Sequence, residues 1–514
     1  MKLPELTLYN SLTRAKERFV PQTEGEIRMY VCGPTVYDLS HVGHARKEVV
    51  FDVIARYLRF RGFSVKYGRN ITDVDDKIIQ RAQAEGISWE EIARRYEATF
   101  REDMEALGVG KPDHEPRATE TIPEMQEIIR LLLEKGFAYE AEGSVYFSVA
   151  RCPGYGKLSG RNPEEMQAGA RVGVEAAKRD PLDFALWKAA KPGEPSWPSP
   201  WGQGRPGWHI ECSAMSRKYL GETLDIHGGG VDLIFPHHEN EIAQSESATG
   251  RVFCRCWVHN GLLTVGKEKM SKSLGNFVTI QDALKKHHAE IIRLFFLSHH
   301  YRSPVDFSED ALLAVRKNLD YFYNTLLRIG EICGPAEDAG ALAGVPGLFP
   351  LEGGSGPAAG TGRDPDAEAR ETLGGFASEF LRQMDDDFNT AEALASLFRT
   401  AAWVNRRIDG GELPEQGGGS RALGLFRRQM QQVGSVFGVF AEDPIRWFRQ
   451  AGRDVGADLG GSDEQIESRI RQREEARKAR DWAAADRIRK ELAGLGVVLE
   501  DSPHGTRWKR QGPC

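Results

Sequence analysis

The spacing of apolar and polar positions near the start of the chain predicts a β–α–β unit. Residues 27–33 are typical of a buried strand that ends in a Gly-Pro turn, and residues 65–71 of a second strand. Between them, residues 49–58 carry apolar side chains at helical intervals. This order favours a parallel sheet and places residues 32–44 at its carboxyl edge, where open α/β sheets bind ligands.

Further along, the pattern predicts mostly helices. Residues 85–140 are amphipathic with helical spacing and precede a short strand at 144–148. Long helical patterns recur at 312–332 and at about 367–440. We therefore expect an α/β fold class: a Rossmann-type parallel-sheet domain with an inserted connective segment, then an α-helical bundle and a small mixed α/β C-terminal domain.

The expected domain boundaries follow composition shifts. A Gly/Pro/Ala-rich stretch at 334–365 is typical of a flexible surface insertion, and a second linker lies near 453–462. The predicted parts are the parallel-sheet domain (1–250, with its connective segment at about 115–205), a short region at 251–311, the helical bundle (312–452) and the terminal module (463–514).

Length and composition narrow the class of protein. The 514 residues exceed the roughly 250–300 that one core usually supports. A net charge of −7 gives no overall nucleic-acid footprint, so any RNA contact must use local basic faces. No apolar run approaches the ~18 residues of a membrane span, residues 1–5 do not open a signal peptide, and the seven cysteines are too sparse for a disulfide framework. We expect a cytoplasmic protein that has no membrane partner.

Two short motifs, about 230 residues apart, suggest a nucleotide site. His41 and His44 flank Gly43 where a helix is expected to begin, and free backbone N–H groups there favour an anion. Lys269 and Lys272 lie in a Ser-flanked loop and can neutralise phosphate charge in a transition state. Each motif alone is equally typical of a buried histidine pair or a solvated lysine loop. Together they favour attack of a carboxylate on ATP, which depends on positioning and charge stabilisation.

A further pattern is compatible with a metal. His237 and Glu241 are four residues apart, so a helix would present both on one face. Such pairs are also common on solvated surfaces, and the spacing does not identify other ligands.

Two remaining patterns favour a structural interpretation. Cys254-Arg255-Cys256 lies in an apolar, strand-like run, and we expect these thiols to pack rather than bind metal. Asp385-Asp386-Asp387 could hold magnesium, but acidic runs beside helices are usually solvated.

The histidine and lysine motifs resemble the paired motifs of class I aminoacyl-tRNA synthetases, with valine at position 42 where isoleucine is commoner. The flanks are more specific and resemble the cysteinyl-tRNA synthetase family of bacterial type, from about residue 5 to 510 except in the Gly-rich insertion. The matching segments are 29–38, 70–77, 207–215, 235–244 and 499–508.

The resemblance implies roles for individual residues. It implies a zinc site held by Cys32, Cys212, His237 and Glu241, whose two thiolates suit zinc. Such a zinc would bind the substrate cysteine as thiolate and reject serine, which shape alone excludes by only about 1–3 kcal/mol. It also implies an ATP site at His41, Gly43, His44, Lys269, Ser271, Lys272 and Ser273, with His41, His44, Lys269 and Lys272 catalytic, and a substrate pocket at Cys32, Gly33, Thr72, Trp208, His227 and Asp232.

The last fifty residues suggest an RNA-binding module. Residues 463–514 carry twelve Arg/Lys and ten Asp/Glu, a net charge of about +2. Two helices, broken near 478–482, would bury Ile466, Ile470, Ile488, Leu492 and Leu495, and a hairpin would follow. A solvated, salt-bridged helix explains the arginines equally well. The family resemblance implies contact with the anticodon of cysteine tRNA.

Together, these observations predict a cysteine–tRNA ligase that acts through cysteinyl-adenylate, with one zinc per chain, magnesium bound with ATP, and a monomeric state. Two alternatives remain open. A ligase of the mycothiol type would deliver the same adenylate to an amino-sugar, although such relatives lack the terminal module. A non-catalytic RNA- or zinc-binding protein would keep the scaffold without the chemistry.

Overall fold

The computed structural model describes residues 5–161, 177–270, 275–334, 365–412, 418–450, 462–502 and 505–510. The chain divides into two compact units. The first comprises Met1–Ile280, Phe296–Asp306 and Leu381–Ala393; the second comprises Gln281–Phe295, Phe307–Phe380 and Leu394–Cys514. Among the described residues, no helix is long and apolar enough to cross a membrane.

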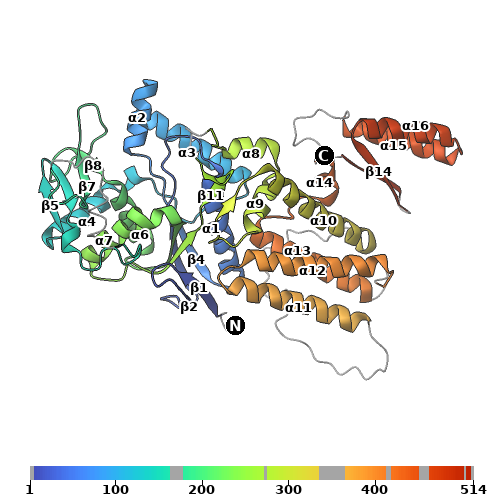
Figure 1. Ribbon diagram of the computed structural model, residues 1–514, viewed down its shortest axis with the longest axis horizontal. Coiled ribbons are helices and arrows are strands. Elements are labelled where there is room, and N and C mark those ends of the chain that lie inside the picture. The colour runs from blue at the N-terminus through green and yellow to red at the C-terminus, as the bar shows by residue number, and fades with distance from the viewer. Residues whose placement is uncertain are drawn as a thin grey trace. The chain divides into compact units, whose positions relative to one another are not determined.

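The centre of the first unit is a four-stranded parallel sheet (Figure 1). The predicted β–α–β unit is confirmed: β3 and β4 pair in parallel and α1 connects them. Two later strands, β9 and β10, extend the sheet on the other side of β3. The sheet order is β10-β9-β3-β4, with β3 at Glu26–Val31, α1 at Val42–Phe60, β4 at Ser64–Arg69, β9 at Leu224–Gly230 and β10 at Cys254–Asn260.

Helix α1 packs closely on this sheet. Val49, Phe51 and Ile54 are buried along it. A Cβ atom at Gly228 of β9 would lie 2.2 Å from the Phe51 ring, so only glycine permits this approach. The antiparallel hairpin of β1 (Leu6–Asn10) and β2 (Ala15–Phe19) lies beside β10. The N-terminus of α1 is therefore fixed at the carboxyl edge of the sheet.

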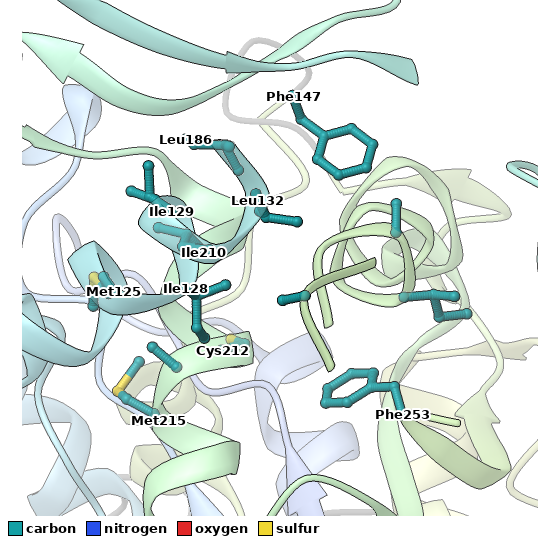
Figure 2. Packing of buried hydrophobic residues seen from close by; sticks show 14 of the residues in the cluster. Met125, Ile128, Ile129, Leu132, Phe147, Leu186, Ile210, Cys212, Met215 and Phe253 are labelled. Atoms are coloured by element: carbon teal, nitrogen blue, oxygen red, sulfur yellow. The ribbon is translucent and has the colours of Figure 1, made fainter. Parts of the chain in front are cut away.

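Residues 76–220 contribute helices and a second sheet. The predicted helical stretch 85–140 forms helices for most of its length, but it ends in strand β5. The apolar face of α4 packs against α6, with Ile128, Leu132 and Ile210 in one buried cluster (Figure 2). The elements are α2 (Asp76–Glu85), α3 (Trp89–Ala106), η1 (Ala118–Thr121), α4 (Ile122–Glu134), η2 (Val149–Arg151), α6 (Trp208–Leu220) and the antiparallel β5 (Ala138–Ala141), β6 (Ser144–Phe147), β7 (Phe184–Ala189) and β8 (Gly204–Pro206).

A small three-stranded sheet completes the first unit. β11 (Leu263–Val265) pairs in parallel with β13 (Val305–Asp306) and antiparallel with β12 (Glu268–Lys269). β12 leads directly into the predicted lysine loop.

The second unit contains a helical bundle, as predicted. In Figure 1, α10 to α13 run alongside one another. Aromatic contacts join them: the ring centroids of Phe322 and Phe398 are 4.3 Å apart, and those of Phe376 and Phe426 are 6.3 Å apart. Its helices are α8 (Ile280–Lys286, from Gln281 on), α9 (Ala289–Leu297, up to Phe295), α10 (Glu309–Cys333), α11 (Pro365–Asp385, up to Phe380), α12 (Thr390–Asp409, from Leu394), α13 (Gly418–Phe437) and α14 (Pro444–Gln450). Nearly all of the predicted insertion at 334–365, and the linker at 453–461, lie outside the described residues.

The C-terminal end forms the predicted helix pair and hairpin: α15 (Asp463–Lys478), α16 (Trp482–Gly494), β14 (Val497–Ser502) and β15 (Gly505–Arg510). Ile466, Ile470 and Leu492 are buried in its core and Ile488 packs against it. The prediction for Leu495 is wrong, because its side chain is 44% exposed. Leu495 follows the end of α16 as its C-cap, where the chain turns toward β14 and helical spacing no longer applies.

The aspartate run 385–387 is not the solvated run that we expected. Asp387 is fully buried, and its carboxylate accepts hydrogen bonds from Tyr9 N, the Tyr301 hydroxyl and Arg302 Nε at 2.7–2.9 Å. Asp385 accepts from the Tyr57 hydroxyl and pairs with Arg61 on α1. The run therefore ties several segments of the first unit together.

This geometry predicts a stability effect for Asp387→Asn. Both carboxylate oxygens accept hydrogen bonds. In asparagine an NH₂ group replaces one of these oxygens, so it faces a donor and that hydrogen bond is lost. Asparagine tolerates the positive φ of this position (63°), so the change tests the contacts alone. We expect a loss of about 2 kcal/mol, which lowers the thermal midpoint by roughly 4–8 °C.

The matched control is Asp386→Asn. Asp386 makes only a half-exposed pair with Lys16, worth about 0–1 kcal/mol, and its midpoint should hardly move. If the calorimetric midpoints of both variants fall equally, the buried contacts of Asp387 do not have the stabilising role given to them here.

Candidate functional site

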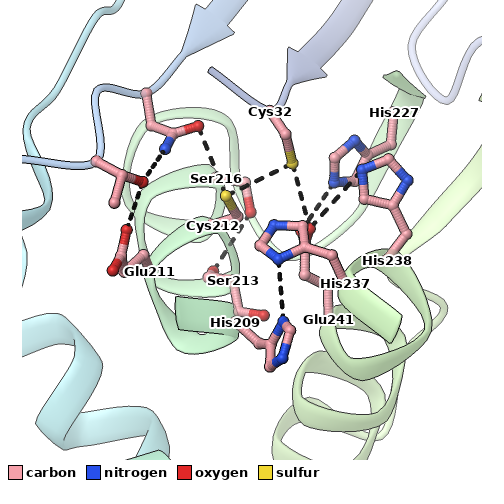
Figure 3. A network of polar contacts seen from close by, with 12 residues as sticks. Cys32, His209, Glu211, Cys212, Ser213, Ser216, His227, His237, His238 and Glu241 are labelled. Carbon is pink, nitrogen blue, oxygen red and sulfur yellow. Dashed lines mark hydrogen bonds and ion pairs between the residues drawn. The ribbon is translucent and has the colours of Figure 1, made fainter. Parts of the chain in front are cut away.

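Four potential metal ligands from separate parts of the sequence meet at the carboxyl edge of the parallel sheet (Figure 3). Cys32 directly follows β3, and Cys212 lies in the first turns of α6. His237 is the last residue but one of η4 (Ile234–His238), a short segment after η3 (Val231–Leu233), and Glu241 lies in the first turn of α7 (Glu239–Thr249). All four side chains are buried, and one ligand atom from each lies within 4.8 Å of the others.

The distances favour this set over a second one that replaces Cys212 and His237 by His227 and His238. Cys32 Sγ is 3.5 Å from Cys212 Sγ and 3.3 Å from Glu241 Oε1. His237 Nε2 is 3.0 Å from the same Oε1. The other oxygen, Oε2, is 2.8 Å from His227 Nε2. Glu241 thus directs one oxygen toward the two cysteines and His237, while His227 orients it through the second oxygen.

The electrostatics of the cluster favour a cation. Burial acts to raise the pKa of Cys212, but hydrogen bonds from Cys32 and His237 lower it to about 6. Burial alone would lower the pKa of His237, yet the Glu241 carboxylate and Cys212 raise it to about 10. The cluster therefore stabilises one positive charge, which a proton on His237 or a metal ion can supply. Two sulfurs, an imidazole and a carboxylate form a donor set that fits zinc.

No role for His209 followed from the sequence, but in the structure its ring contacts that of His237. His237 Nδ1 lies 3.0 Å from His209 Nδ1, and its Nε2 faces Glu241. A partner on the second ring nitrogen fixes the orientation of an imidazole that binds metal.

A buried hydrogen-bonded chain on the other side of Cys212 was also missed. The Thr72 hydroxyl donates to Glu211 Oε2 at 2.7 Å, and Asn70 Nδ2 donates to Thr72 Oγ1. Asn70 Oδ1 accepts from Gly33 N and lies 3.5 Å from Cys212 Sγ. Burial raises the pKa of Glu211 well above its usual range, which favours a neutral carboxyl group beside the cysteine pair. The only sequence signal for this hydrogen-bonded chain is that Glu211 directly precedes Cys212.

The predicted pocket residues lie at different depths near the four potential ligands or the His41 turn. Trp208 begins α6, is 37% exposed, and its ring centroid is 4.3 Å from that of His237. Thr72 and His227 are buried and bind the carboxylates of Glu211 and Glu241. Asp232 is exposed on η3 and lies close enough to His41 to influence its pKa. Gly33 packs against the Asn70 carbonyl, which an added Cβ would approach to 1.6 Å.

The two motif histidines form the first turn of α1, where we expected them. His41 is the N-cap residue, and its Nδ1 accepts from Gly43 N at 3.0 Å. His44 Nδ1 accepts from His41 N at 3.4 Å, and the two rings stack with centroids 3.8 Å apart. Because each Nδ1 is an acceptor, each neutral ring carries its proton on Nε2. Burial lowers the pKa of His41 to about 4 and that of His44 well below its usual value.

The lysine loop begins and ends next to this helix. Lys269 ends β12, and the Met270 methyl group lies 3.0 Å from the position of a Cβ atom on Gly43. Beyond the loop, Thr279 forms a bridge with His41. Ser271, Lys272 and Ser273 lie outside the described residues. The structure therefore brings the base of the loop to the histidine motif.

Cys254 and Cys256 are buried in β10 and belong to neither metal set found among the described residues. This agrees with their expected packing role.

Family models match three segments of the chain. The class I tRNA synthetase (C) catalytic domain matches residues 18–317, a DALR domain matches 379–441, and the cysteinyl-tRNA ligase anticodon binding domain matches 460–508. Among solved structures, methionyl-tRNA synthetase of Mycobacterium tuberculosis in complex with methionyl-adenylate aligns with a TM-score of 0.58 at 18% identity, over 80% of this chain and 92% of that one. That likeness supports the class I synthetase fold.

Curated relatives match over almost their whole length. The cysteine–tRNA ligases of Syntrophobacter fumaroxidans and Geobacter metallireducens are each 51% identical over 505 residues, which cover 98% of this chain and 99% of each relative. The chain therefore belongs to the cysteine–tRNA ligase family of class I aminoacyl-tRNA synthetases.

Proposed function

We propose that the protein activates L-cysteine with ATP, forming cysteinyl-adenylate and pyrophosphate, and transfers the cysteinyl group to the 3′ end of cysteine tRNA. The observation that carries this proposal is the buried Cys32–Cys212–His237–Glu241 cluster, at the same sheet edge as the His41/His44 turn. The four-residue cluster selects the amino acid, and the His41/His44 turn binds the phosphates of ATP.

The ATP site would use the neutral histidines as donors. With Nδ1 of each ring occupied by a backbone N–H, Nε2–H is free to donate to a phosphate oxygen. The N-terminus of α1 adds its positive dipole end. Lys269 and Lys272 would neutralise the pyrophosphate as it leaves, and Gly43, Ser271 and Ser273 would let the nucleotide approach closely. Magnesium would accompany ATP.

The cysteine site would use zinc held by Cys32, Cys212, His237 and Glu241. When bound, zinc is a Lewis acid that keeps the substrate sulfur as a thiolate ligand. His227 and His209 would hold Glu241 and His237 in place, and Thr72, Gly33, Trp208 and Asp232 would line the space around the amino acid.

The C-terminal module supports tRNA as the acceptor. Trp482, at the start of α16, is 61% exposed, which leaves its ring available to stack on a base. Arg473 and Arg477 pair with Asp501 and hold α15 to β14, so these two arginines serve the fold rather than the RNA. We infer a catalytic domain (1–250), a stem-contact region (251–311), a helical bundle (312–452) and an anticodon-binding module (463–514), in a cytoplasmic monomer.

The first prediction from the proposed function tests the activity itself. The unmutated protein should catalyse cysteine-dependent ATP–pyrophosphate exchange, and Lys272→Ala should lower its kcat by about 10²–10³-fold, because charge stabilisation in the transition state is lost. No exchange in the unmutated protein would reject the enzyme and leave the non-catalytic alternative.

Exchange alone does not separate tRNA from an amino-sugar acceptor. Transfer of labelled cysteine to cysteine tRNA decides this, since a ligase of the mycothiol type would label the sugar and leave the tRNA unlabelled.

The second prediction tests the metal. Cys212→Ser should lose most of the bound zinc and lower exchange by more than the roughly 10–100-fold typical of losing an outer partner of a metal ligand. Cys254→Ser, equally buried but outside the cluster, is the matched control and should keep its metal. In the cobalt-substituted protein, cysteine should shift the visible spectrum and serine should not. An unchanged spectrum with cysteine would exclude direct thiolate binding.

The third prediction concerns pH. The folded His41 has a pKa of about 4, below the unfolded value near 6.5, so folding favours its neutral form. Its contribution to stability is complete above pH 6.5 and is lost as pH falls toward 4, where the unfolded chain binds the extra proton. Asparagine is a good N-cap, so His41→Asn should reduce the fall in thermal midpoint between pH 7 and pH 4.5. An equal fall in both proteins would contradict the shifted pKa.

A further inference from the structure

Arg46 is a buried cation whose contacts are all with backbone oxygens. It lies on α1 two residues after His44, is fully buried, and has no hydrogen bond or ion pair to a carboxylate among the described residues. Burial lowers the pKa of Arg46 to about 10, so it remains charged at neutral pH. A buried, unpaired charge costs several kcal/mol relative to an apolar side chain of similar volume. Its position therefore calls for a role beyond filling space.

The guanidinium of Arg46 binds two chain segments that cross each other, one at residues 261–262 and one at residues 301–303. Nη1 donates to the carbonyls of Gly261 and Leu262 at 2.9 and 2.8 Å. Nη2 donates to the carbonyls of Tyr301, at 3.1 Å, and Ser303. The segments touch at Gly261, where a Cβ atom would lie 2.5 Å from the Ser303 carbonyl oxygen. Arg46 thus fixes this crossing relative to the helix that carries His41 and His44.

The same crossing continues into the small sheet that supports the lysine loop. Leu263 pairs with Val305, and Thr264 pairs with both Asp306 and Lys269. Asp306 Oδ1 accepts from the Thr264 hydroxyl and from Lys267 N, both at 2.7 Å, and so holds the turn between β11 and β12. A continuous set of contacts leads from Arg46 through Asp306 to the backbone of Lys269.

The far end of the loop rests on the same helix start. Val42 N donates to the Val278 carbonyl at 3.1 Å, and Ile280 N donates to the Ser40 carbonyl at 2.9 Å. The Phe277 ring packs edge-on against His41 with centroids 5.2 Å apart. This end is thus fixed by backbone contacts to α1, whereas the near end is linked to α1 through the small sheet and the Arg46 guanidinium.

We propose that Arg46, supported by Asp306, is a positioning residue that sets β12, and with it the backbone of Lys269, at a fixed distance from His41 and His44. It touches neither substrate nor nucleotide. Its effect is exerted through Lys269, on the transition state in which cysteine attacks the α-phosphate. This inference rests on the proposed function.

A double-mutant cycle tests it. Arg46→Lys keeps the charge, but its ammonium cannot reach four carbonyls on two segments in the planar geometry of a guanidinium. We expect kcat of cysteine-dependent pyrophosphate exchange to fall about 10–100-fold, with KM for cysteine unchanged, because a shift of about 1 Å in a positioned group has this effect. With Lys269→Ala already present, Arg46→Lys should reduce kcat by less than threefold, since the positioned ammonium is gone.

Arg293→Lys is the matched control. Arg293 is an equally buried arginine on α9 and donates from Nε and Nη2 to the Phe437 carbonyl. Its variant should lower the thermal midpoint and leave kcat per folded enzyme unchanged. Asp306→Ala, at a partly exposed site, is the second arm if Arg46→Lys does not fold, and it should show the same non-additivity with Lys269→Ala.

Equal kcat losses with and without Lys269→Ala, or a loss of stability with no loss of kcat, would overturn the inference. Failure of the proposed function gives a different result, because the unmutated protein would then catalyse no exchange.

Discussion

The parallel pairing of β3 with β9 is the constraint on which the site depends. In this register Val31 lies beside Gly228, and the Cys32 N–H donates to the Gly228 carbonyl. Cys32 is thereby fixed at the edge where β9 also ends, within reach of the segment that carries His237 and Glu241. The close approach of Phe51 to Gly228 fixes α1 against the same two strands, so His41 and Cys32 share one edge.

Burial then determines how charge is distributed along that edge. The cysteine pair and Glu241 create a place that favours a cation. About the His41/His44 turn, burial removes charge from both rings, and the positive end of the helix favours an anion. The two halves of the edge thus favour opposite charges: a cation at the cysteine pair and an anion at the helix start. A thiolate can bind at the first half only if a metal ion is bound there, whereas the triphosphate of ATP suits the second half directly.

Sequence reasoning was most successful where periodicity or local geometry decides the structure. The β–α–β unit, the helix start at His41 and the terminal hairpin follow from spacing and turn residues. It failed where tertiary contacts override local preference, as at Asp387, whose burial depends on Tyr9 and Tyr301 far along the chain. Leu495 failed because helical spacing was extended past the end of α16. His237 and Glu241 follow from helical spacing, but the two cysteines could be named only through the family resemblance, because Cys32 and Cys212 are 180 residues apart and no spacing rule relates them.

The residues that sequence reasoning missed share one property: they act on other residues and not on a ligand. His209 lies beside His237 and Asn70 beside Cys212, Glu211 accepts a hydrogen bond from Thr72, and Arg46 binds two backbone segments. A sequence motif consists of side chains whose chemical groups are required for binding or catalysis. A supporting residue only has to hold another residue in place, and several different sequences can do so. The crossing at Gly261 makes this concrete. The segment after the lysine loop is held by backbone bonds to α1, whereas the segment before it is held by the small sheet, which Arg46 links to α1. The proposed placement of Lys269 relative to His41 and His44 therefore depends in part on a buried guanidinium that neither motif contains.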